Sequence, residues 1–214
     1  MTVEVKICGL TRSEDAARAA GAGASYLGVV FAPSPRRIDT ATGKQIVKAS
    51  GGVPVLGVFA GQQVSEILQI CTAAGLAGAQ LQGLYSTADA RRLRESGILV
   101  WRVARLASEA DLGWLLQLRE ASSAVLVEAA TPQALGGTGV SLPLYLAREA
   151  RANLPGHQMV LAGGLTPRTV ADAISDVRPD VVDVSSGIEL RPGVKDPEKM
   201  MRFMEAVVGH HTTR

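Results

Sequence analysis

Two glycine-rich segments near the end of the chain contain the residue types that hold a phosphate group. The first covers residues 162–167 and the second residues 185–187. Each follows a short apolar run and leads towards a predicted helix start, where free backbone N–H groups and the helix dipole attract an anion. Glycine lets the backbone approach a ligand closely, and serine adds a hydroxyl donor. The predicted phosphate-binding residues are Gly163, Gly164, Ser185, Ser186 and Gly187.

A third glycine cluster, residues 136–139, includes Gly137 and follows the sixth apolar run. We expect it to close over the same region and to contribute to substrate binding. No lysine follows any of the three clusters in the way a nucleotide P-loop requires, so they do not predict a nucleotide site. One Gly-Gly pair alone is typical of an ordinary turn, whereas two such segments after consecutive strands indicate a phosphate site.

Cys8 and Glu128 are the candidate base and acid. Cys8 ends the first apolar run, and a thiolate near positive charge can act as a general base. His157 and the two histidines of the C-terminal tail do not lie at strand ends, so no histidine is placed to form a triad. Glu128 ends the sixth apolar run, where partial desolvation raises the pKa of a carboxyl group and suits a general acid. A plain buried Cys8 and a surface Glu128 are the alternatives.

Arg36 is the candidate cation for a substrate carboxylate. It follows Pro-Ser-Pro at residues 33–35, which stiffens the loop, and a guanidinium suits bidentate contact with a carboxylate. Because Arg36 and Arg37 are adjacent, we expect one to face the site and the other solvent; a fully solvated pair is the alternative. Asp183, in the eighth apolar run, is expected at the substrate site, with a structural role in tying loops through backbone N–H groups. Lys6 lies on the same face of its strand as Cys8, deeper in the interior.

Eight short apolar runs alternate with eight helix-like stretches, and these elements must position the candidate residues. The runs cover residues 3–8, 26–31, 53–59, 78–81, 98–103, 124–127, 159–161 and 181–184. The helical stretches cover residues 13–20, 40–49, 64–74, 87–95, 108–119, 142–152, 167–175 and 197–208. This alternation predicts one (β/α)8 barrel domain over residues 1–214, with residues 209–214 as a fraying tail. A doubly wound open sheet, which has five or six such units, is the alternative.

Composition narrows the classes of partner. The net charge is +2 and aromatic residues make up 4% of the 214 residues, which disfavours nucleic acid as a partner. No segment has the roughly 18 consecutive apolar residues of a membrane span. Cys8 and Cys71 form neither a disulfide framework nor a metal-ligand spacing, so we expect no metal and a cytoplasmic location. A small phosphorylated molecule is the expected partner, and the chain could be a monomer or a homodimer.

Several segments together resemble the phosphoribosylanthranilate isomerase family of tryptophan biosynthesis. The matching segments are residues 6–11, 34–36, 57–59, 136–139, 161–165, 183–189 and 193–196, which span nearly the whole chain in the expected order. The resemblance implies a cofactor-independent Amadori rearrangement of N-(5-phosphoribosyl)anthranilate to its 1-deoxyribulose phosphate isomer. It implies that Cys8 is the base, that Arg36 binds the anthranilate carboxylate, and that the glycine-serine segments bind the phosphate.

Two positions depart from the family pattern. Glu128 stands where the family usually has an aspartate acid, and its extra methylene moves the carboxyl group by about one C–C bond. Gln82 stands where the family usually has a histidine, and it can form hydrogen bonds to substrate but cannot carry charge. The alternatives are an aminoaldose isomerase of histidine synthesis and a degenerate barrel that only binds a phosphorylated metabolite.

Overall fold

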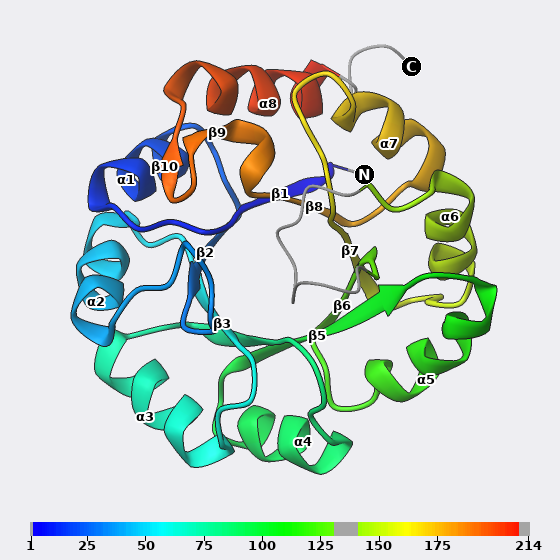
Figure 1. The fold of residues 1–214 in the computed structure, drawn as a ribbon, viewed down its shortest axis with the longest axis horizontal. Coiled ribbons are helices and arrows are strands. Elements are labelled where there is room, and N and C mark those ends of the chain that lie inside the picture. Colours follow the sequence, from blue (N-terminus) through cyan, green and yellow to red (C-terminus); the bar gives the residue numbers. More distant parts are fainter. Residues whose placement is uncertain (1, 131–140, 210–214) are drawn as a thin grey trace.

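Eight parallel strands close into a barrel in sequential order, β1 to β8, in the computed structural model (Figure 1), which describes residues 2–130 and 141–209. The strands are β1 (Glu4–Ile7), β2 (Tyr26–Val30), β3 (Val55–Phe59), β4 (Gly78–Leu81), β5 (Leu99–Leu106), β6 (Ala124–Ala129), β7 (Gln158–Leu161) and β8 (Val181–Val184). The pairing of β1 with β8 closes the sheet, so the predicted barrel is confirmed and the open doubly wound sheet is excluded. The short, nearly continuous apolar strands fit a sheet that is buried on both faces.

An outer ring of helices surrounds the barrel (Figure 1). The helices are α1 (Ser13–Gly21), α2 (Thr40–Ala49), α3 (Val64–Ala74), α4 (Thr87–Glu95), α5 (Trp114–Arg119), α6 (Leu144–Ala152), α7 (Val170–Val177) and α8 (Pro197–Gly209). Their apolar faces pack on the outward side chains of the strands, and this forms the largest hydrophobic cluster. In the part of the chain that the structure describes, no helix is long and apolar enough to cross a membrane.

Several element bounds differ from the sequence prediction. Strand β5 continues past residue 103 to Leu106, because Arg105 and Leu106 still pair with β6. The predicted helix at 108–119 is divided into a 3-10 turn η1 (Glu109–Gly113), which begins with a Ser108–Asp111 capping box, and α5. Helix α7 starts at Val170 and not at residue 167, after a turn in which the Thr166 N–H donates to the Thr169 hydroxyl.

The barrel interior is mostly apolar and contains a buried ion pair. The inward side chains that form this second cluster are Leu56, Trp101, Val103, Ala124, Leu126, Val160, Ala162 and Val181. Among them Lys6 Nζ lies 2.9 Å from Asp183 Oδ1 and 5.6 Å from the centre of the Trp101 ring. Lys6 is fully buried, as its place on the strand predicts. This pair lies one strand layer below Cys8, because alternate residues of a strand share a face.

A short hairpin, which the sequence analysis did not predict, lies between β8 and α8. It consists of a 3-10 turn η2 (Ser186–Ile188), β9 (Glu189–Arg191) and β10 (Val194–Lys195). The Thr11 hydroxyl donates to the Gly193 carbonyl at 2.6 Å. The Lys195 N–H donates to the buried Asp15 carboxylate at 3.1 Å. These two bonds fasten the hairpin to the loop after β1 and to α1, beside the end of the strand that precedes Cys8.

Candidate active site

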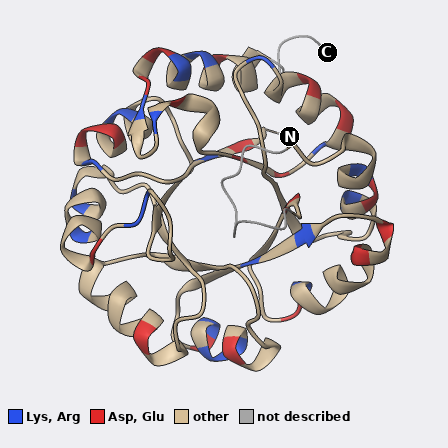
Figure 2. Ribbon diagram, viewed as in Figure 1, with Lys and Arg blue, Asp and Glu red and all other residues tan. Residues whose placement is uncertain are grey.

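Charged residues are concentrated on the outer helices, and few occur on the barrel strands (Figure 2). Burying a charge costs free energy unless the charge is paired, so buried charged residues at the strand ends are candidates for a functional site. The described residues contain no group of three or more His, Cys, Asp or Glu side chains that could hold a metal ion. We use "barrel mouth" for the C-terminal ends of the eight strands, where β/α barrels carry their active sites.

Cys8 follows β1 directly at the barrel mouth and is only 7% exposed. Its N–H donates to the Val184 carbonyl of the neighbouring β8, which fixes the backbone there. Gly28 of β2 provides the space for the thiol, since a Cβ atom at position 28 would lie 2.7 Å from Cys8 Sγ and 3.1 Å from Lys6 Cε. The thiol and the Lys6 side chain therefore lie side by side against Gly28.

The pKa of the Cys8 thiol is raised from its ordinary value of 9.0, mainly because of burial. The positive charges of Lys6 and Lys195 lower it, and the negative charge of Asp183 raises it further. Two cations therefore lie near the thiol, but the effect of burial on its pKa outweighs theirs. Cys8 is mostly a neutral thiol near pH 7.

Glu128 lies one residue before the end of β6 and is 7% exposed. Burial raises the pKa of its carboxyl group to about 7, as the sequence analysis predicted for an acid in a partly desolvated site. Arg105, paired with Glu128 across β5 and β6, opposes this shift with its Nε 3.8 Å from Oε1. A hydrogen bond from Gln82 also opposes it. Glu128 is therefore half-protonated near neutral pH.

Arg36 is buried, whereas Arg37 is exposed. Of the two adjacent arginines, Arg37 is therefore the one that faces solvent. Arg36 Nε donates to Glu189 Oε1 at 2.9 Å and Nη2 donates to Oε2 at 2.7 Å. This bidentate bond raises the pKa of Arg36 and uses the side edge of the guanidinium. The end edge, formed by Nη1 and Nη2, is the one that a second carboxylate can take.

The two predicted phosphate segments come together at the barrel mouth. Gly163 and Gly164 have left-handed φ angles of 96° and 66°, which favour glycine. Gly187 lies so close to the first segment that a Cβ atom there would be 1.9 Å from the Leu165 carbonyl oxygen. We call residues 162–167 and 185–187 the phosphate loops from here on. Their contact explains why glycine is required at position 187.

The structure places Gln82 after the predicted fourth strand, gives Asp183 a different partner and does not describe Gly137. Gln82 follows β4, is buried beside Glu128, and its Oε1 has no hydrogen-bond partner among the described residues. Asp183 was predicted to tie loops through backbone N–H groups; among the described residues its carboxylate instead accepts from Lys6 Nζ, because the two face each other inside the barrel. Gly137 lies outside the described residues. The predicted tail also lies outside them, except for Gly209, which ends α8.

Glu189 and Lys195 form a buried ion pair that their residue types did not predict. Glu189 is 8% exposed and Lys195 is 1% exposed, and their side chains meet at 2.9 Å. Both belong to segments that carry the family resemblance, but their residue types alone do not separate a buried ion pair from solvated surface charges. Gly28 was also missed; a glycine inside a strand is a usable signal of close approach by another group.

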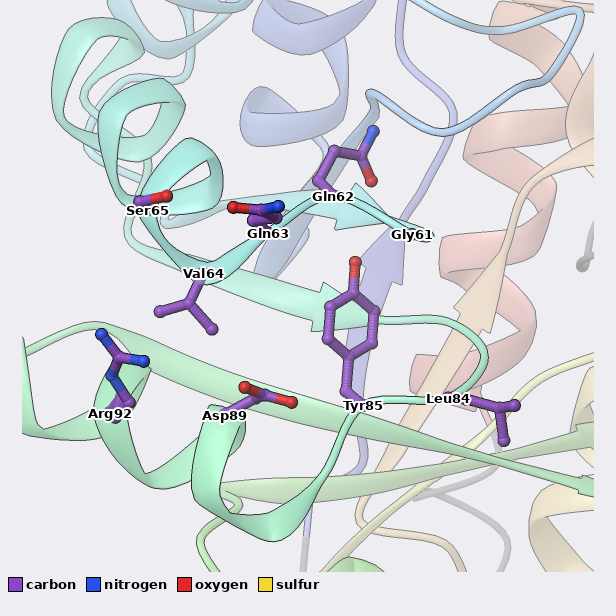
Figure 3. A pocket seen from close by; sticks show the side chains of 9 residues that line it. All are labelled: Gly61, Gln62, Gln63, Val64, Ser65, Leu84, Tyr85, Asp89 and Arg92. Atoms are coloured by element: carbon purple, nitrogen blue, oxygen red, sulfur yellow. The ribbon is translucent and has the colours of Figure 1, made fainter.

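A separate cavity of about 450 Å³ lies between the loop that precedes α3 and the loop that precedes α4 (Figure 3). Residues 61–65, 84, 85, 89 and 92 line it. The Tyr85 ring points towards the segment of Gly61 and Gln62, while the Leu84 side chain points away from it (Figure 3). None of the predicted catalytic or binding residues lines this cavity, which lies in the loops after β3 and β4.

The closed barrel, with an acid, a thiol and an arginine at its strand ends, places the chain in the class of β/α-barrel enzymes. Comparison with known families narrows this class. The model of the N-(5'-phosphoribosyl)anthranilate (PRA) isomerase family matches residues 5–206, so the chain belongs to this family and is an isomerase.

Similar proteins agree along the whole length of the chain. The N-(5'-phosphoribosyl)anthranilate isomerase of Chlorobium luteolum is 39% identical over 208 residues, covering 95% of this chain and 96% of the relative. The crystal structure of the Thermotoga maritima enzyme has a TM-score of 0.88 at 34% identity and covers 97% of this chain and 100% of that one. A further isomerase structure holds reduced 1-(o-carboxyphenylamino)-1-deoxyribulose 5-phosphate, with a TM-score of 0.85 at 33% identity, covering 97% of this chain and 100% of that one.

Proposed function

We propose that this chain converts N-(5-phosphoribosyl)anthranilate into 1-(2-carboxyphenylamino)-1-deoxyribulose 5-phosphate by general acid and base catalysis. The observation that carries the proposal is the placement of Glu128, with a pKa of about 7, and Cys8 in one barrel mouth. The isomerase structure that binds a reduced 1-deoxyribulose phosphate supports this substrate class. An Amadori rearrangement needs one proton donated and one removed, and these two side chains can supply both steps.

In the first step, protonated Glu128 donates its proton to the furanose ring oxygen. The bond between this oxygen and C1′ then breaks, and the lone pair of the anilino nitrogen forms a C=N bond to C1′. The product is an open-chain protonated Schiff base with a free hydroxyl on C4′. Burial keeps a useful fraction of Glu128 protonated at neutral pH, which an exposed glutamate could not offer.

In the second step, the Cys8 thiolate removes the proton on C2′. The electrons of this C–H bond form a C1′=C2′ double bond, and the C=N electrons return to nitrogen, which gives an enolamine. Transfer of the C2′ hydroxyl proton to C1′ completes the ketone. Cys8 then holds one proton more and Glu128 one proton fewer than at the start, and proton exchange with water restores both, so substrate and product differ only in the placement of protons and electron pairs. Lys6, beside the thiol, stabilises the thiolate form.

The rest of the site would hold the two charged ends of the substrate. The phosphate loops offer backbone N–H groups and serine hydroxyls to the phosphate. The free end edge of Arg36 would donate to the anthranilate carboxylate, while Glu189 keeps the side edge occupied. Gln82 would hold the carboxyl group of Glu128, and Asp183 would hold Lys6 below the substrate.

The proposal also covers the cofactor requirement, the cellular location and the oligomeric state of the protein. Because proton transfers alone account for the rearrangement, no metal or organic cofactor is required by this chemistry. We propose one barrel domain that works in the cytoplasm, as a monomer or a homodimer. The Thermotoga maritima relative is dimeric and monomers of it have been crystallised, so sedimentation equilibrium on this chain decides between the two states.

Complementation of a tryptophan auxotroph that lacks this isomerase tests the proposal directly. The wild-type chain should restore growth without tryptophan, and Cys8→Ala should not, because it removes the base. Purified wild-type protein should also convert the substrate in vitro. Soluble wild-type protein that neither rescues growth nor converts the substrate contradicts the proposal and favours a barrel that only binds a phosphorylated metabolite.

A further inference from the structure

Lys195 is a fully buried lysine that lies outside the eight-stranded barrel, in the hairpin that follows β8. Its backbone is held by Asp15, whose carboxylate accepts the Lys195 N–H at 3.1 Å. Its ammonium group has three oxygen neighbours, which belong to Glu189 and Ser185. A buried ammonium group is costly to desolvate, so each of these contacts bears on why a lysine occupies this position.

The first contact connects Lys195 to Arg36 through Glu189. Lys195 Nζ donates to Glu189 Oε1 at 2.9 Å, and the same oxygen accepts the Arg36 Nε–H at 2.9 Å. The Glu189 carboxylate is therefore fixed between two cations. Without the ammonium group, Arg36 and the Gly193 N–H, which donates to Oε1 at 3.3 Å, would be the remaining partners of the Glu189 carboxylate, and the carboxylate would be held less firmly. Lys195 thus determines where the guanidinium lies, although it does not contact it through a hydrogen bond.

The second contact connects Lys195 to the phosphate loops. Nζ donates to the Ser185 carbonyl oxygen at 3.1 Å and lies 3.5 Å from the Ser185 hydroxyl oxygen. In a trans peptide the carbonyl and the following N–H point in opposite directions. Fixing the Ser185 carbonyl towards Lys195 therefore turns the Ser186 N–H away from the lysine, as a donor for an anion at the loop.

The two regions that Lys195 contacts are also adjacent in space. A Cβ atom at Gly9 would lie 2.6 Å from Arg36 Cδ and 2.7 Å from the Ser185 hydroxyl oxygen. Arg36 and the second phosphate loop thus pack on the same glycine. The buried ammonium group of Lys195 lies where it can fix the position of Arg36 and the orientation of the second phosphate loop.

We propose that Lys195 is a positioning residue that orients Arg36 for the substrate carboxylate and the Ser185–Ser186 peptide for the substrate phosphate. This inference rests on the proposed function, because it takes the two anionic groups of that substrate as the ligands. Lys195 would then position the groups that bind both charged ends of the substrate. For a ligand that carries only the carboxylate, Lys195 should affect binding only through Arg36. For a ligand that carries only the phosphate, it should affect binding only through the Ser185–Ser186 peptide.

The test measures equilibrium binding of two separate probes, inorganic phosphate and anthranilate, by calorimetry on the full chain. In Lys195→Met, both dissociation constants should rise about tenfold, as expected when a charge-assisted hydrogen bond behind each site is lost. Lys199→Met is the matched control. Lys199 lies in the same region and donates to the Glu189 backbone carbonyl, not to its carboxylate, so both constants should stay within twofold of the wild type.

Thermal unfolding of each variant separates misfolding from mispositioning. If Lys195→Met does not fold, Lys195→Gln is the second variant, because it keeps a polar group in the buried site and leaves Glu189 paired with Arg36. Binding of both probes should weaken in it as well, because the shorter, uncharged amide does not replace the ammonium group between Glu189 and Ser185. Lysine-to-arginine replacement is not informative, because the buried site is already filled by the lysine chain.

The outcomes are distinct. Unchanged binding of both probes in folded Lys195→Met overturns the inference, and weaker binding of only one probe overturns the shared role. Loss of turnover without any change in either dissociation constant also overturns it. If the wild type binds both probes but does not isomerise the substrate, the proposed function fails while the positioning role of Lys195 stands.

Discussion

Gly28 and Cys8 face each other across β1 and β2 so closely that a Cβ atom on residue 28 would lie 2.7 Å from Cys8 Sγ. Gly28→Ala should therefore displace the thiol by a few tenths of an ångström or more and lower kcat/KM about a hundredfold. Gly21→Ala is the control, because a Cβ atom at the end of α1 meets nothing within 4 Å. Steady-state kinetics of both variants checks this, and full activity in Gly28→Ala contradicts the placement of the base.

Glu128 should make the protein less stable as the pH rises. Its pKa is about 7 in the folded protein, because of burial, against 4.5 for a solvated glutamate as in the unfolded chain, so the folded state binds the proton more tightly between these values. The free energy of unfolding should then fall by about 3 kcal/mol from pH 4 to pH 8 through this group alone. Glu128→Gln removes this loss, so the difference between variant and wild type in urea unfolding should grow with pH. A difference that does not change with pH contradicts the raised pKa.

The pH profile of kcat/KM should be a plateau with two falling limbs. The reactive form needs Glu128 protonated, with a pKa of about 7, and Cys8 ionised, with a pKa raised from 9.0. Below pH 7 the rate should rise with pH as thiolate accumulates, and above the thiol pKa it should fall as Glu128 loses its last protons. Both groups are correctly protonated in at most roughly one molecule in a hundred. A profile that falls between pH 7 and 9 contradicts the assignment of Cys8 as base.

Alkylation reports the state of Cys8 independently of catalysis. The rate of modification by iodoacetamide should rise about tenfold per pH unit from pH 7 to 9, because only the thiolate reacts. Cys71, whose pKa burial raises to about 12, should stay unmodified over this range. Lys6→Met should slow the reaction of Cys8 at a given pH, since the cation that favours its thiolate is lost. Mass spectrometry measures both sites, and fast, pH-independent labelling of Cys8 contradicts the burial effect.

Arg36 should bind a carboxylate through geometry as well as charge. Arg36→Lys keeps the charge but cannot present one edge to Glu189 and another to a ligand. The dissociation constant for anthranilate should rise about tenfold or more, while that for inorganic phosphate should change little. Arg37→Lys is the control, because that side chain is exposed. Equal losses for both ligands in Arg36→Lys contradict a specific carboxylate contact.

The strand order and most of the site could be predicted because each depends on local sequence. Buried parallel strands are short apolar runs, and Cys8, Glu128 and the glycines of the phosphate loops lie where those runs end. The prediction failed where a contact between distant segments decides the structure. Strand β5 is longer because β6 still pairs with Arg105 and Leu106, and no apolar run marks that extension.

The network behind Arg36 illustrates the same limit. Glu189 and Lys195 are ordinary surface residue types, and only the fold shows that they are buried and paired. Asp183 was expected to bond to the backbone, but the Lys6 ammonium faces it inside the barrel. Charge pairing across a barrel depends on which strands become neighbours, and a local pattern does not contain that information.

The hydrogen bonds that fasten the last hairpin to the first loop connect residues 182 and 180 positions apart in the chain. The Lys6–Asp183 pair spans 177 positions. The ribosome synthesises nearly the whole chain before both partners of each pair exist. Cys8 therefore lacks the nearby charges of Asp183 and Lys195 during almost all of translation. A chain that ends before Lys195 therefore lacks the donor that holds the Glu189 carboxylate behind Arg36 and the Ser185 carbonyl behind the second phosphate loop.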